Sequence, residues 1–247
     1  MSFQALVLAG SRGETDPVAA SEGVPEKALV DIGGQAMLAR VIGALRAAGA
    51  TRIAVAASPG PVEALALSLG CEVFPASSGP SESAAAGFSR LGAPMLLTTA
   101  DHALLKPEWV RDFVAEAGAT GDVAVMLARR AAVEQAAPGS RRTYLRFSDG
   151  DWSGCNLFYF ATPQAGAAFA LWKQVEADRK RPWRIVRKLG PGLLLRYLLG
   201  RLPLSEAMAH LGRLAGVSVG IVAARDGLAA VDVDKPDDLA QVRALIG

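Results

Sequence analysis

The sequence predicts an α/β fold: a mostly parallel, doubly wound sheet in a Rossmann-like three-layer sandwich, with a helical insertion near the C-terminus. Two observations carry this prediction. Short apolar runs alternate with segments of helical periodicity through the first half of the chain, which is typical of βαβ units. A glycine turn at residues 10–13 and an acid, Asp101, each follow an apolar run. Ligands of such sheets bind beyond the carboxyl ends of the strands, so these two segments mark the expected site.

The elements of the first half follow from these runs and from turn residues. Short apolar runs predict strands at residues 5–9, 28–30, 51–57, 71–74 and 94–101. Apolar side chains at helical spacing predict helices at residues 36–48, 62–69, 83–91 and 107–117. Gly49 and Gly70 suit helix ends and Pro107 a first helical turn, while residues 75–82 form a small polar loop.

The second half is less regular. We expect a strand at residues 122–127, a loop at 132–142, a hairpin of 143–147 with 152–160, a helix at 162–177, broken helical structure over 183–213, strands at 217–223 and 228–233, and a closing helix at 236–246. There is no internal repeat and no linker segment. The prediction is therefore one domain spanning residues 1–247.

Composition narrows the class of protein. A hydrophobic share of 51% in 247 residues is enough for a large core. A net charge of +2 is too small to indicate nucleic-acid binding. Cys71 and Cys155 form no C-x-x-C motif, so neither a zinc site nor a disulfide framework is indicated. Without a secretory pattern or a run of roughly 18 apolar residues, we expect a soluble, cytoplasmic protein.

The turn at residues 10–13 reads Gly-Ser-Arg-Gly. Small residues let backbone N–H groups approach a phosphate, and Arg12 can add a cation. A glycine turn can equally serve only to reverse the chain. The spacing matches neither G-x-G-x-x-G opening into a helix nor G-x-x-x-x-G-K-[ST], so a dinucleotide fingerprint and a P-loop are both excluded.

Three acids are candidates for a cation site. A carboxylate at Asp101 could hold Mg²⁺, which prefers oxygen ligands, or could simply cap a helix. Asp232 and Asp234 are two residues apart on a predicted strand, so both would face one side of it. Two such acids suit a divalent cation better than a dry core, although Asp234 also fits a helix N-cap. His102 has no partner at ligand spacing and is expected to be structural.

Residues 179–188 contain six cations in ten residues. They form either a solvated helix start or a receptor for an anionic acceptor, with Trp183 beside it. The apolar residues 193–199 follow, and basic-plus-apolar segments can lie on a membrane surface. A core helix is the alternative, so peripheral membrane contact stays open.

These motifs together resemble the MobA-like NTP transferases and sugar-phosphate pyrophosphorylases of the nucleotide-diphospho-sugar transferase superfamily. The family opening L-A-G-G-x-G-x-R, followed by P-K, is similar to residues 8–15 and 25–27, with Ser11 for a glycine and Thr15 where many members carry a catalytic arginine. Residues 232–239 are similar to the family ending D-x-D-[ST]-P-x-D-L, with Lys235 at the Ser/Thr position. The likeness spans nearly the whole chain.

The resemblance implies a fold of the glycosyltransferase-A (GT-A-like) type, with residues 1–130 binding nucleotide and 131–247 binding acceptor. It implies Mg²⁺-dependent transfer of an NMP group from a nucleoside triphosphate to a phosphorylated small-molecule or lipid-linked acceptor, releasing pyrophosphate. The implied catalytic residues are Arg12, Lys27 and Asp101, and the implied metal ligands are Asp101, Asp232 and Asp234. The implied nucleotide-binding residues are Leu8, Ala9, Gly10, Ser11, Arg12, Gly13, Lys27, Ser78, Gly79 and Ser83. The implied acceptor-binding residues are Gly154, Asn156 and Lys188, although Asn156 could instead be an ordinary hairpin amide.

Two rival functions remain open from the sequence. A glycosyltransferase of the same fold would carry its D-x-D near Asp101, where this chain reads Thr-Ala-Asp. A non-catalytic binder of nucleotide or lipid phosphate is the second, supported by Ser11, Thr15 and the long loop before Pro25. Release of pyrophosphate separates an enzyme from such a binder.

Overall fold

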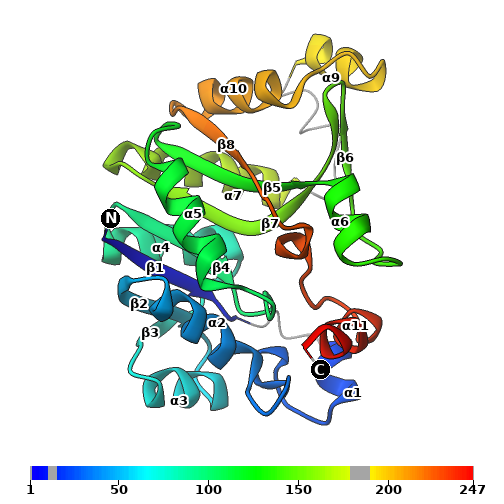
Figure 1. The fold of residues 1–247 in the computed structure, drawn as a ribbon. Coiled ribbons are helices and arrows are strands. Elements are labelled where there is room, and N and C mark those ends of the chain that lie inside the picture. The colour runs from blue at the N-terminus through cyan, green and yellow to red at the C-terminus, as the bar shows by residue number, and fades with distance from the viewer. Residues whose placement is uncertain (1, 11–15, 179–189, 247) are drawn as a thin grey trace.

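A computed structural model describes residues 2–10, 16–178 and 190–246, and it is built around an eight-stranded sheet (Figure 1). The strands are β1 (Phe3–Leu8), β2 (Ala50–Ala57), β3 (Glu72–Pro75), β4 (Met95–Thr99), β5 (Val123–Arg129), β6 (Leu145–Phe147), β7 (Gly150–Phe160) and β8 (Val219–Ala223). Their order is β3-β2-β1-β4-β7-β5-β8, and β6 pairs with β7. β7 runs antiparallel to β4, β5 and β6, while the other pairs are parallel. The predicted mostly parallel α/β fold is confirmed.

Helices cover both faces of the sheet. They are α1 (Pro17–Ser21), α2 (Met37–Ala47), α3 (Pro61–Ser68), α4 (Pro80–Leu91), α5 (Pro107–Ala117), α6 (Arg130–Ala136), α7 (Ala168–Ala177), α9 (Pro191–Leu198), α10 (Leu204–Ala215) and α11 (Pro236–Ile246). Short 3₁₀ helices are η1 (Lys27–Leu29), η2 (Pro163–Ala167) and η3 (Gly227–Ala230).

Alternating side chains of the central strands make two separate cores. Val7 of β1 packs with the apolar side of α2 and α5, whereas its neighbour Leu6 packs with α4 and α7. Successive side chains of a strand point to opposite faces, and a sheet covered on both sides therefore needs wholly apolar strands. Among the described residues no helix is long and apolar enough to cross a membrane.

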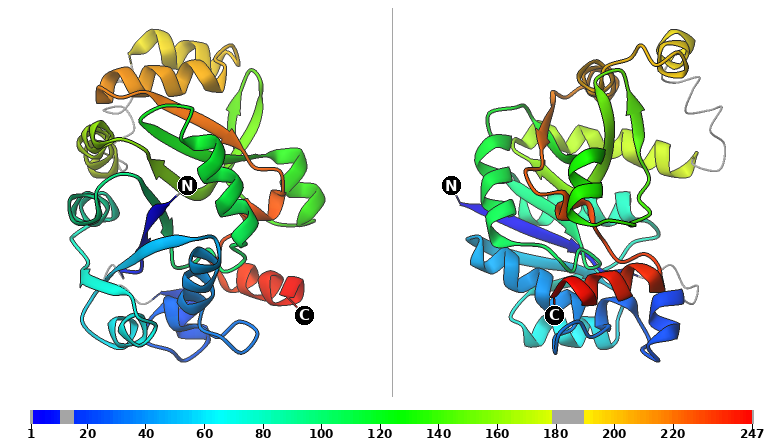
Figure 2. Two further views of the ribbon diagram at one scale, coloured as in Figure 1. Left: turned by 60° about the vertical axis from the view of Figure 1, so that its left-hand side comes forward. Right: turned by 45° about the vertical axis from the view of Figure 1, so that its right-hand side comes forward.

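The C-terminal segment returns to the start of the chain. The backbone N–H of Val233 donates to the carbonyl of Asp101 at 3.1 Å. α11 then lies beside α1, as the views of Figure 2 show, and Arg243 of α11 pairs with Glu22. Residues far apart in sequence thus meet near the carboxyl ends of β1 and β4.

Three predicted elements are wrong. Residues 28–30 form no strand; Lys27–Leu29 is the turn η1, because β2 and β4 already occupy both edges of β1. Within residues 132–142, an alanine-rich stretch forms α6, in keeping with the high helix propensity of alanine. Residues 228–230 lie in η3, which Asp226 caps, and residues 231–233 belong to no strand. The hairpin and the other predicted strands and helices are present, with shifted ends, as far as the described residues reach.

Candidate functional site

The carboxyl ends of β1 and β4 lie side by side. In the register of these strands Leu8 is opposite Thr99, and Ala100 N–H donates to the carbonyl of Leu8 at 3.0 Å. Ala9 and Gly10 therefore leave the sheet next to Asp101. The two segments predicted to form the site, residues 10–13 and Asp101, follow neighbouring parallel strands. Parallel pairing brings the carboxyl ends of such strands to the same end of the sheet.

Gly10 is packed too closely for any larger residue. A Cβ at this position would come within 2.7 Å of Cβ of Ala76, whose N–H donates to the carbonyl of Ala57 at 3.0 Å. Gly10 thus packs against the loop after β3, which contains Ser78 and Gly79. Ser11, Arg12 and Gly13 lie outside the described residues, as does Thr15.

Lys27 is surrounded by three carboxylates. Its Nζ lies 2.8 Å from Oδ2 of Asp101, 3.6 Å from Oδ1 of Asp234 and 4.0 Å from Oδ2 of Asp16. Burial opposes the charge on this lysine, but the attraction of Asp101, Asp234 and Asp16 outweighs it and raises the pKa of Lys27. The raised pKa favours the ammonium form of Lys27, and the cluster contains three acidic side chains for one basic one.

Two of these carboxylates are held in place by further bonds. The hydroxyl of Thr99 donates to Oδ1 of Asp101 at 2.5 Å. Oδ1 of Asp16 accepts from the N–H of Val18 at 2.8 Å and so caps α1. Asp234 has the most exposed side chain of the three, at 59%. The remaining oxygens converge on Lys27 and offer hard ligands to a cation.

Asp232 belongs to a different cluster. Because residues 231–234 form no strand, Asp232 and Asp234 do not share a face as predicted. The Asp232 carboxylate pairs with Arg142 and accepts from Nδ2 of Asn156 at 2.5 Å. Arg142 also donates to the Asp232 carbonyl at 3.0 Å and approaches Asp238. Asp232 is thus ion-paired with Arg142, whereas Asp234 lies near Lys27, so these two predicted metal ligands belong to different clusters.

Arg142 also fixes Asp234 indirectly. Oδ2 of Asp238 accepts from the N–H groups of Asp234 and Lys235 at 3.1 and 3.0 Å. The guanidinium of Arg142, whose side chain is 9% exposed, approaches Oδ1 of the same Asp238. Asn156 itself adopts φ 51°, a left-handed conformation that asparagine tolerates better than most residues. Together these contacts position the segment that presents Asp234 to Lys27.

The loop after β3 is closed by its own side chains and by α7. Oγ of the buried Ser83 accepts from Ser77 N–H at 2.9 Å, and Ser78 is hydrogen-bonded to Glu82. Oε2 of Glu176, from α7, accepts from Ser81 N–H at 3.1 Å and its carboxylate packs against Gly79. These hydrogen bonds fix the conformation of the loop where it enters α4.

The remaining predicted acceptor residues are less informative. Gly154 lies on β7, and the space beside its Cα is open. Lys188 lies outside the described residues. His102 is fully buried beside Trp109, and burial lowers the pKa of its imidazole to about 4, which fits a neutral structural role.

Three contributing residues were not predicted. Asp16 could have been found, since an acid before Pro17 is a helix-start signal. Arg142 and Glu176 gave no local signal, because their partners lie more than 80 positions away.

The carboxylates around Lys27 are the residues that could hold Mg²⁺. Within the described ranges no group of three or more acidic, histidine or cysteine side chains forms a ready-made metal site. Asp101 and Asp234 nevertheless converge on one cation, the Lys27 ammonium. Mg²⁺ is commonly held by one or two carboxylates together with substrate phosphates. The donor set therefore fits Mg²⁺ that is bound with a phosphate ligand.

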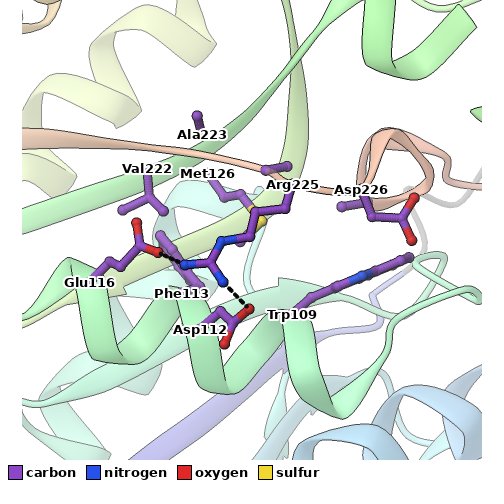
Figure 3. Close-up of a pocket in the computed structure, with 11 residues that line it drawn as sticks. Trp109, Asp112, Phe113, Glu116, Met126, Val222, Ala223, Arg225 and Asp226 are labelled. Carbon is purple, nitrogen blue, oxygen red and sulfur yellow. Dashed lines mark hydrogen bonds and ion pairs between the residues drawn. The ribbon is translucent and has the colours of Figure 1, made fainter. Parts of the chain in front are cut away.

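A small pocket lies between α5 and the segment formed by β8 and the residues that follow it (Figure 3). Arg225 lies across it and pairs with Asp112 at 3.3 Å and Glu116 at 2.8 Å. Apolar side chains, including Phe113 and Met126, form its floor. The charged side chains of this pocket are ion-paired, and none of them belongs to the Lys27 cluster. We therefore interpret these ion pairs as structural links between α5 and the segment after β8.

Comparisons with known proteins agree with this geometry. Residues 5–191 match the model of the MobA-like NTP transferase domain. A hypothetical transferase from Thermus thermophilus has 32% identity and a TM-score of 0.82, covering 97% of this chain and 100% of its own. A CMP:2-keto-3-deoxy-manno-octonic acid synthetase complexed with CTP has 17% identity and a TM-score of 0.59, with 100% and 98% covered.

A nucleotidyl transferase from Methanothermobacter thermautotrophicus has 17% identity and a TM-score of 0.56, with 98% and 96% covered. These last two likenesses concern the fold alone. A search of curated protein sequences found no match.

Proposed function

Because this chain belongs to the MobA-like NTP transferase family and is a nucleotidyltransferase-family enzyme, we propose that it moves an NMP group from a nucleoside triphosphate to a phosphorylated acceptor. One observation carries the proposal. The Lys27 ammonium and the carboxylates of Asp101 and Asp234 meet at the carboxyl ends of β1 and β4. This is where ligands of such sheets bind.

The residues of the site have separate tasks in this reaction. We assign the glycine-containing sequence at residues 10–13 and the Lys27 ammonium to binding the triphosphate oxygens. Asp101 and Asp234 would hold Mg²⁺, which would neutralise phosphate charge. Ser78, Gly79 and Ser83 border the base. We assign residues 1–130 to the nucleotide and residues 131–247, with Asn156, to the acceptor.

The chemistry needs little beyond positioning and charge. An oxygen of the acceptor phosphate attacks the α-phosphorus, the bond to the β-phosphate breaks, and pyrophosphate leaves. The acceptor phosphate is already an anion, so no strong base is required. Lys27 stabilises charge that develops on the leaving group, and this kind of electrostatic contribution is the main one in phosphoryl transfer.

The test is pyrophosphate release. The four ribonucleoside triphosphates are each incubated with Mg²⁺ and a panel of sugar phosphates and lipid phosphates, and pyrophosphate is measured through an inorganic pyrophosphatase. We expect one pair to react and Asp101→Asn to lose at least about a hundredfold in rate. Asp112→Asn, an exposed acid on α5, is the matched control and keeps the rate. Hydrolysis of a nucleotide-sugar in place of pyrophosphate release would identify a glycosyltransferase instead.

A further inference from the structure

The position of Lys27 has a consequence for the order of binding. This inference rests on the proposed function and extends it. We propose that the Lys27 ammonium occupies the cation position between Asp101 and Asp234 in the free enzyme, so that the divalent metal enters together with the triphosphate and not before it. Lys27 would then change partners, from carboxylates to phosphate oxygens, during each cycle.

The contacts show that Lys27 and a metal would compete. Nζ lies 2.8 Å from Oδ2 of Asp101 and 3.6 Å from Oδ1 of Asp234, so it contacts one oxygen of each carboxylate that would hold a metal. A divalent ion bound there would meet a positive charge at contact distance, and this repulsion is strong in a partly buried site. Metal binding between these two oxygens therefore requires the ammonium to leave.

Lys27 can move only through its side chain. Its carbonyl accepts from Val30 N–H at 3.1 Å, which closes η1, and Ala28 beside it is buried. The side chain of Lys27 is only 21% exposed. An ammonium displaced from three carboxylates within this surface needs a new anion, because burial disfavours an unpaired charge. Triphosphate oxygens supply that anion.

The triphosphate without a metal is also hindered from binding. Three carboxylates surround a single ammonium, so an approaching polyanion is repelled until a divalent cation neutralises Asp101 and Asp234. Each ligand thus removes an obstacle to the other. A coupling of this kind is reciprocal, since each ligand must raise the affinity of the other by the same factor.

Mn²⁺ binding to the free protein tests this without any reaction. Mn²⁺ serves as the probe, and free Mn²⁺ is counted by electron paramagnetic resonance during titration of the wild type and Lys27→Met. We expect Lys27→Met to bind one Mn²⁺ with a dissociation constant at least about tenfold lower than that of the wild type. The double variant Lys27→Met/Asp101→Asn should lose this gain, which locates the ion.

Two further variants make the result specific. Lys106→Met removes another lysine of an ion pair, 3.2 Å from Asp226, and should leave Mn²⁺ binding as in the wild type. Lys27→Arg keeps the positive charge and should keep binding weak. Where Lys27→Met does not fold by circular dichroism, Lys27→Gln replaces it in the same titration.

Equal Mn²⁺ affinity in the wild type and the Lys27→Met protein would overturn the inference and leave Lys27 as a fixed structural ion. That outcome would not touch the proposed function, which stands or falls on pyrophosphate release. A protein that releases no pyrophosphate but shows the difference in Mn²⁺ affinity would overturn the proposed function and leave the competition between Lys27 and the cation supported. The two proposals therefore fail in distinguishable ways.

Discussion

Replacing Arg142 tests how the site is held together. Arg142→Met removes the partner of Asp232, whose side chain is only 14% exposed, and also the hydrogen bond to the Asp232 carbonyl. Breaking a buried ion pair by removing one partner leaves an uncompensated charge. The pair is nearly buried at both ends, so we expect a loss of about 3 kcal/mol in the free energy of unfolding. For a chain of this size that lowers Tm by roughly 6–12 °C.

The assay is urea unfolding followed by circular dichroism, in a double-mutant cycle. Asp232→Asn removes the stranded charge but can still accept from Asn156, so Arg142→Met/Asp232→Asn should recover at least about 1 kcal/mol. The control is Arg130→Met, an arginine 46% exposed whose ion pair with Glu134 should contribute less than about 1 kcal/mol. If Arg142→Met costs no more than Arg130→Met, the claim that Arg142 anchors the segment carrying Asp234 is refuted.

Three further predictions concern single residues. Gly10→Ala should weaken triphosphate binding, because its Cβ would press on Ala76; isothermal titration checks it, and unchanged affinity would contradict the packing. Gly227→Ala should lower stability by about 1–3 kcal/mol, since its Cβ would collide with the Ala132 carbonyl; a urea midpoint equal to that of the wild type would contradict this. Hydrogen bonds from the hydroxyls of Ser218 and Thr162 and from Ser218 N–H lower the pKa of Asp122 from 3.8 to about 2. This stabilisation is present above pH 3.8 and is lost as the pH falls towards 2, so the advantage of the wild type over Asp122→Asn in urea unfolding should vanish across that window, and an advantage that stays constant would show that Asp122 is not responsible.

Much of the first half of the fold was predictable, because β2, β3 and β4 are short apolar runs that are each followed by a helix. Residues 28–30 are also a short apolar run, but they form no strand. The prediction also placed Gly10 and Asp101 at one edge of the sheet, since parallel strands bring their carboxyl ends together. It could not show that β7 is inserted antiparallel between β4 and β5. A strand buried on both faces has the same apolar pattern in either direction.

The contacts within the site were harder to predict from the sequence. Lys27 was predicted, but its partners Asp16, Asp101 and Asp234 come from three distant segments, and no local pattern joins them. The spacing of Asp232 and Asp234 predicts a common face only in a strand, and η3 replaces that strand. Arg142 was within a predicted loop, and only the tertiary fold brings it to Asp232.

The most direct test of the central claim is a thermal-shift series with the four ribonucleoside triphosphates, each with and without Mg²⁺. A ligand at a hundred times its dissociation constant stabilises the folded state by about 2.7 kcal/mol, or roughly 5–10 °C here. We predict a Mg²⁺-dependent rise in Tm with at least one triphosphate, lost in Asp101→Asn and kept in Asp112→Asn. No rise with any triphosphate, or an equal rise in Asp101→Asn, would contradict a nucleotide site at Lys27, Asp101 and Asp234.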